Sequence, residues 1–305
     1  MYNNIIFREE KNGHLYTTYK LTYSANKEKF IQYILPVLEE EYGLGKSFDE
    51  KTSSLSSDRK EIMRKLMQKY NTPDPTVNPL NSKNRTQLKP SRSKIAEVIA
   101  KDYLQKDLNV SFAGRISLEE DDPDLPRRGV DNFGFIFTEV NGDIRLTKMV
   151  ICEVKASDAK KNPPDVVSKN QDSLYNSLLE LSKGDKRLKK ALVKSFDRFN
   201  VEKLTALIAE LAIDIDQNSE LKQIREKMLI VPFLLRTENE YKQKDFEKFY
   251  EDPSEFNWTV INFYIMLVDV PLDEFATDIY SRLRGENYEW IFKKKSASFI
   301  RFEKS

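Results

Sequence analysis

The sequence predicts an α/β protein with a mixed central sheet flanked by helices. Stretches with strand-like alternation are interleaved with stretches of helical spacing along the chain. Two stretches, MLIVPFLL and INFYIMLVDV, are apolar almost without interruption, which is typical of strands buried on both faces of a sheet. The chain has 305 residues, of which 39% are hydrophobic, and this suffices for a substantial core.

The chain divides into three segments. Residues 1–90 hold one strand, two helices and a loop rich in proline and asparagine, so we expect an N-terminal α+β segment. Residues 91–185 carry the order helix, strand, hairpin, strand, helix. Residues 186–305 contain the two buried strands and further helices. We expect this last segment to continue the sheet of the middle one and to offer a surface to a partner.

Within the middle segment, helical spacing covers 93–105, and strands are predicted over 130–140 and 144–157. Asn141-Gly142 between the strands is a strong signal for a tight hairpin turn. Residues 166–183 have the pattern of a single helix. The segment therefore predicts a hairpin with a helix on either side of it in the chain.

The composition excludes several classes of site. Cys152 is the only cysteine and His14 the only histidine, so internal disulfides and zinc sites built from several histidines are ruled out. Lys and Arg number 50 against 49 for Asp and Glu, so any surface for nucleic acid is a local patch. No signal peptide or membrane-length apolar run is present, and we expect a cytoplasmic, soluble protein.

Three acids and a lysine stand out in the middle segment. Glu97 lies on the predicted helix, Asp131 begins the first hairpin strand, and Glu153 and Lys155 share one face of the second. Charges in a buried strand are costly unless they are paired or bind a metal. The hairpin can bring Asp131 and Glu153 to one rim, where Mg²⁺ accepts such a carboxylate pair. Lys155 can then orient the attacking water or stabilise the charge that develops on a phosphate.

GVD followed by CEVK resembles the D…(D/E)xK motif of the PD-(D/E)xK nuclease superfamily, and the surrounding order of elements is similar to its core. The resemblance implies that Asp131 and Glu153 bind Mg²⁺, for which Mn²⁺ can substitute, with Lys155 serving the water. It implies that Glu97 supports the metal. QDSLY is similar to the Q-x-x-x-Y pair of one branch of the superfamily, which implies that Gln171 and Tyr175 order the site and contact DNA backbone.

Basic residues flank the predicted metal site on both sides. They can contact a phosphate backbone, although solvated loops have the same composition. The candidates are Arg127 and Arg128 before the site, and Lys160, Lys161 and Lys169 after it.

A narrower resemblance concerns RRGVDNFGF, ICEVKAS and the two buried strands, which look like the nuclease subunit of Hachiman anti-phage defence systems. It implies a helicase partner that controls a DNA-cutting subunit. We therefore expect a metal-dependent deoxyribonuclease. Two alternatives stay open: a non-cleaving DNA-end-binding or regulatory subunit with the same fold, and an interaction protein whose acids are surface charge. The residues do not discriminate between DNA and RNA.

Overall fold

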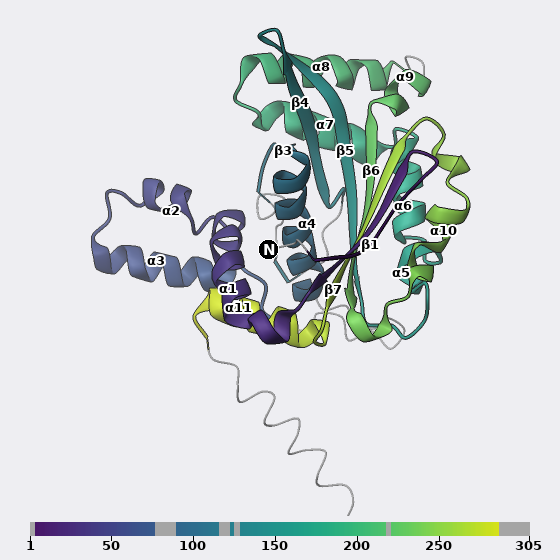
Figure 1. Ribbon diagram of the computed structural model, residues 1–305. Helices are drawn as coiled ribbons and strands as arrows, with labels where there is room; N and C mark the ends of the chain where they lie inside the picture. The colour runs from purple at the N-terminus through teal and green to yellow at the C-terminus, as the bar shows by residue number, and fades with distance from the viewer. Residues whose placement is uncertain (1–3, 77–89, 116–122, 125–128, 218–220, 287–305) are drawn as a thin grey trace, which may run out of the picture.

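The computed structural model describes residues 4–76, 90–115, 123–124, 129–217 and 221–286. A seven-stranded sheet runs through the molecule in the order β1-β2-β7-β6-β5-β4-β3. Helices cover both of its faces (Figure 1). The predicted mixed α/β architecture is confirmed.

The sheet is parallel at its centre and antiparallel at both ends. β2, β7, β6 and β5 run parallel to one another, whereas β1 and the β4-β3 pair add antiparallel edges. Strands from all three segments of the chain join it. Their bounds are Ile5–Lys11 (β1), His14–Leu21 (β2), Ser111–Phe112 (β3), Asn132–Val140 (β4), Asp143–Ser157 (β5), Met228–Thr237 (β6) and Val260–Val268 (β7).

The helices form a layer on each face of the sheet. α1, α4 and α11 pack on one face, and α6, α7, α8 and α10 on the other (Figure 1). None of the helices in the described ranges is both long and apolar enough to cross a membrane. The bounds are Tyr23–Glu41 (α1), Lys46–Lys51 (α2), Ser57–Tyr70 (α3), Pro90–Leu108 (α4), Asp165–Ser168 (α5), Leu174–Ser182 (α6), Lys186–Arg198 (α7), Glu202–Asp216 (α8), Leu221–Glu226 (α9), Glu247–Glu251 (α10) and Leu272–Arg284 (α11).

The central strands divide their side chains between two apolar cores. On β5, Val150, Cys152 and Val154 pack in the core beneath α4. Met149 and Ile151 point the other way, toward the core beneath α6, α7 and α8. β6 is buried along almost its whole length, as its continuous apolar sequence predicts.

In residues 1–90 the structure has the strand β1 and the helix α2 besides the one strand and two helices predicted. A second local prediction fails between residues 166 and 183. The single helix predicted there is wrong: α5 ends at Ser168, and α6 begins only at Leu174 after a turn. The Ser173 hydroxyl accepts a hydrogen bond from the Asn176 N–H, which fixes the start of α6 as an N-cap. The predicted Asn141-Gly142 turn is confirmed, and both residues have positive φ.

A buried arginine holds the loop that follows β5. Arg236 of β6 is fully buried and pairs with Asp245 at 3.0 Å. Its guanidinium also donates to the carbonyls of Ser157, Ala159 and Lys161, at 3.2, 2.6 and 3.1 Å. One side chain therefore fixes the chain as it leaves the strand that carries Glu153 and Lys155.

Replacing Arg236 by methionine leaves the Asp245 carboxylate buried without its ion-pair partner. We expect the free energy of unfolding to fall by about 3–5 kcal/mol, because breaking a buried pair from one side is costly. Urea unfolding measures the change. The control is Arg282→Met, which removes an exposed pair with Glu28 and should cost less than about 1 kcal/mol. Equal losses in the two variants would contradict this account.

Candidate functional site

The two hairpin strands separate at the candidate site. β4 and β5 pair as far as Asn132 and Cys152, and β5 then continues to Ser157 paired only with β6. At this point the Val154 N–H donates a hydrogen bond of 2.8 Å to Asp131 Oδ2. The Asp131 carboxylate thus accepts the hydrogen bond that a backbone carbonyl of β4 would accept if the ladder continued. The chain enters β4 through Gly129, whose φ of 137° is rarely adopted by residues with a side chain.

Glu153 is buried on the face of β5 that packs against α6 and α7. Only 3% of the residue is exposed. The Ser177 hydroxyl of α6 hydrogen-bonds to its carboxylate, whereas Oε1 has no hydrogen-bond partner among the described residues. Burial raises the pKa of Glu153 well above the usual glutamate value, and the nearby Asp131 carboxylate raises this pKa further. Glu153 is therefore a buried acid and not surface charge.

Lys155 follows on the same face and is partly open to solvent. Its side chain is 24% exposed, and Nζ lies 4.0 Å from Asp172 Oδ2. The positive charges of Lys155 and of Arg187 on α7 lower the pKa of Glu153 and so act against burial and the Asp131 carboxylate, which raise it. The acid and base on the same face of a buried strand therefore belong to one electrostatic cluster.

Glu97 joins the cluster from the opposite side of the sheet. It is 5% exposed on α4, and its backbone carbonyl accepts a hydrogen bond of 3.0 Å from the Asn132 amide. Burial raises the pKa of the Cys152 thiol, and Asp131, Glu153 and Glu97 raise it further, in that order. The three predicted acids thus all act electrostatically on one buried thiol.

Gln171 and Tyr175 are not arranged as the resemblance implies. Gln171 is exposed in the turn before α6, so the two residues do not share a helical face. Tyr175 is 1% exposed and packs its ring against Phe249 and Phe256. Burial raises the pKa of Tyr175 to about 12. Tyr175 is therefore a core residue, and the side chain of α6 that reaches the cluster is Ser177.

The predicted basic residues are dispersed. Arg127 and Arg128 lie outside the described residues. Lys160, Lys161 and Lys169 are exposed after β5, and Lys161 forms an ion pair with Asp165 at 2.5 Å. None of these three lysines lines the cavity beside Asp131.

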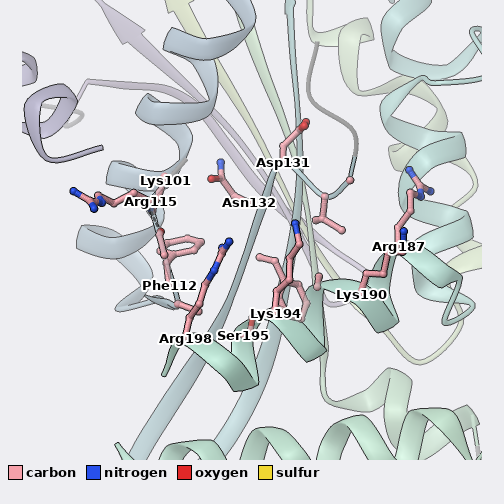
Figure 2. A pocket seen from close by; sticks show the side chains of 16 residues that line it. Lys101, Phe112, Arg115, Asp131, Asn132, Arg187, Lys190, Lys194, Ser195 and Arg198 are labelled. Atoms are coloured by element: carbon pink, nitrogen blue, oxygen red, sulfur yellow. Dashed lines mark hydrogen bonds between the residues drawn. The ribbon is translucent and has the colours of Figure 1, made fainter. Parts of the chain in front are cut away.

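That cavity, of about 290 Å³, is strongly basic. Asp131 is the only acid among its lining side chains, which include six bases: Lys101, Arg115, Arg187, Lys190, Lys194 and Arg198. In Figure 2, Lys194 and Arg198 extend from α7 toward Phe112 and the start of β4. Sequence reasoning missed this helix. The signal was present, because bases at 187, 190, 194 and 198 recur with the spacing of one helical face.

The carboxylates can hold a divalent ion with help from a substrate and water. Within the described ranges, no group of three or more His, Cys, Asp or Glu side chains is placed to hold a metal ion. Mg²⁺ commonly uses only one or two carboxylates and completes its shell with waters and phosphate oxygens. Asp131 and the unsatisfied Oε1 of Glu153 fit that smaller donor set.

Neither the comparison with protein-family models nor that with curated proteins finds a match for this chain. The geometry of the cluster and the cavity therefore carries the functional argument.

Replacing Glu153 by glutamine should stabilise the protein in a pH-dependent way. Below the usual glutamate pKa of 4.5, Glu153 is protonated in both the folded and the unfolded chain. As the pH rises from there through the raised folded-state pKa, the folded chain retains a proton that the unfolded chain has lost, so stability decreases. We expect Glu153→Gln to raise the melting temperature by roughly 2–5 °C at pH 7 and by less than about 1 °C at pH 4.

Thermal unfolding followed by circular dichroism at the two pH values measures this difference. Glu180→Gln, at an exposed position of α6, is the control and should change neither melting temperature. A Glu153→Gln shift of equal size at both pH values would assign the effect to packing rather than to charge.

Proposed function

We propose that this protein is a metal-dependent nuclease that hydrolyses DNA phosphodiester bonds at Asp131, Glu153 and Lys155. The observation that carries the proposal is the burial of Glu153, with one unsatisfied oxygen, beside Asp131 and a basic cavity. Burying a carboxylate in this way costs stability, so a buried, strongly perturbed acid next to a cavity favours a functional role. The basic lining suits an anionic substrate such as a phosphate backbone.

The side chains have separate tasks in the proposed reaction. Asp131 and Glu153 would hold Mg²⁺ or Mn²⁺, and Glu97 would add negative charge behind them. When bound, the ion lowers the pKa of a water molecule and neutralises charge on the phosphate. Lys155, on the same face as Glu153 and partly exposed, would orient the water or stabilise the charge that builds up on the phosphate oxygens.

The role of a partner belongs to the same proposal. The sequence resemblance to the nuclease subunit of Hachiman systems supports an effector in anti-phage defence that a helicase-type protein controls. The near balance of 50 basic and 49 acidic residues also supports a partner, because it favours weak DNA affinity for the isolated chain.

A second candidate is a subunit that binds DNA ends without cleaving them. Two observations favour it: Asp131 Oδ2 already accepts the Val154 N–H, and no three-ligand group occurs in the described part of the chain. The two functions differ in turnover. In both cases we expect the protein to bind metal or DNA, but only the nuclease hydrolyses the DNA.

The test is a cleavage assay on linear duplex, circular and single-stranded DNA, with Mg²⁺, Mn²⁺ or EDTA. We expect metal-dependent cutting by the wild-type protein and a loss of at least about 100-fold in the Glu153→Ala/Lys155→Ala variant, since both charges act on the reacting phosphate and water. The matched control is Glu180→Ala/Lys183→Ala, which removes the same residue types from an exposed ion pair. This control should cut like the wild type.

Metal-dependent stabilisation separates the outcomes. Mg²⁺ at 100 times its dissociation constant should stabilise the wild-type protein by about 2.7 kcal/mol, and the double variant should not respond. Stabilisation and DNA binding without cutting would favour the non-cleaving subunit. If Mg²⁺ neither stabilises the wild-type protein nor supports cutting, a metal site is refuted. If the wild-type protein and the Glu153→Ala/Lys155→Ala variant cut equally well, the residue assignment is refuted.

A further inference from the structure

We infer that the basic cavity between α7 and β3 binds one single strand of nucleic acid, with an unpaired base on Phe112 and phosphates along α7. This inference rests on the proposed function, since it names the strand form that reaches Asp131 and Glu153. It assigns binding roles to Lys190, Lys194 and Phe112.

The row of bases on α7 leads toward the candidate site. Lys190 and Lys194 are exposed in the middle of the row, with Arg187 and Arg198 half-buried at its ends. Between Arg187 and Arg198 the helix rises by about 16 Å, which suffices for several consecutive phosphates. At one end Arg187 acts electrostatically on Glu153. A strand that follows the row is therefore led to the carboxylates.

The other wall of the cavity lies close to the far end of the row. A Cβ on Gly114 would come within 3.0 Å of Arg198 Nη1, so the glycine allows the arginine to lie against this loop. Lys101 of α4 donates to the Gly114 carbonyl at 2.7 Å, and its Nζ lies 5.5 Å from the ring centroid of Phe112. This wall also carries Arg115, whereas Glu41 Oε1, at 2.5 Å from Lys101 Nζ, offsets the charge of Lys101.

Aromatic rings distinguish this cavity from a plain phosphate site. Phe112 and Phe133 both line it and are only partly buried. Strand-binding proteins combine a basic groove for the backbone with aromatic rings on which bases stack. In a duplex the bases are stacked on one another and paired, so reaching such a ring first requires unstacking. A cavity of about 290 Å³ lies at the lower end of ligand-pocket volumes and suits one nucleotide unit.

The test measures binding in EDTA with the Glu153→Gln variant, so the result does not depend on cleavage. The probes are a labelled single strand of thymidines and a blunt hairpin duplex of the same length, followed by fluorescence anisotropy over a range of salt concentrations. We expect the single strand to bind at least 10-fold more tightly than the duplex. Adding Lys190→Gln/Lys194→Gln should weaken single-strand binding at least 10-fold. It should also reduce the slope of log binding constant against log salt concentration by about 1.4, because each of the two lost phosphate contacts contributes about 0.7.

The matched control is Lys186→Gln/Lys189→Gln, which removes the same charge from the same helix at positions that do not line the cavity. We expect it to change the affinity less than twofold. Phe112→Leu keeps an apolar side chain but removes the stacking surface, and should weaken single-strand binding by about 5-fold or more.

Tighter duplex binding, equal effects of the two lysine pairs, or no binding at the lowest salt would each overturn the inference. Failure of the proposed function gives a different result: binding follows the expected pattern, but the wild-type protein neither cuts DNA nor gains stability from Mg²⁺. If Mg²⁺ no longer stabilises the Lys190→Gln/Lys194→Gln variant, the substitutions have disturbed the metal site. That result would also overturn the claim that these two lysines act only by binding the nucleic-acid strand.

Discussion

The hydrogen bond from the Val154 N–H to Asp131 is the contact on which the candidate site depends. It closes the β4-β5 ladder with a side chain where a further strand residue would otherwise pair. Because β4 begins there and β5 runs on, an acid at the end of one strand meets an acid inside its neighbour. The next pair in the register would place Asp131 opposite Glu153 on the same face, as cross-strand neighbours. The same separation of the strands leaves room for the cavity beside them.

The acidic cluster of Asp131 and Glu153 lowers the stability of the fold that holds it. Two neighbouring carboxylates, one of them buried, repel each other, and desolvation adds to that repulsion. Lys155 of β5 itself, Arg187 of α7 and Ser177 of α6 offset part of the cost. Two of these three side chains, Arg187 and Ser177, belong to helices that follow β5 in the chain. Part of the compensation therefore depends on the correct packing of these later helices.

The sequence predicted the sheet class, the buried central strands and the hairpin turn, whereas a working site formed by Asp131, Glu153, Lys155 and Glu97 stays a prediction. These features follow from local patterns: apolar runs, the Asn141-Gly142 turn, and alternation along β5. The position of Tyr175 could not be predicted, because Ser173 starts α6 and the ring then packs on Phe249, far away in the sequence. The α7 bases were visible as a helical row, but their relation to Asp131 depends on how α7 packs on the sheet.

The parallel pairing of β2 with β7 has a consequence for synthesis of the chain. Thr17 pairs with Tyr264 and His14 lies beside Ile261, a separation of 247 residues for the latter pair. The ribosome adds roughly 5–20 residues per second, so β7 is made about 12–50 s after the β1-β2 hairpin with which it pairs. During that interval one edge of β2 has no native partner, and such an open edge invites pairing with other chains. Newly made chains are therefore most exposed to misassembly just before β7 emerges.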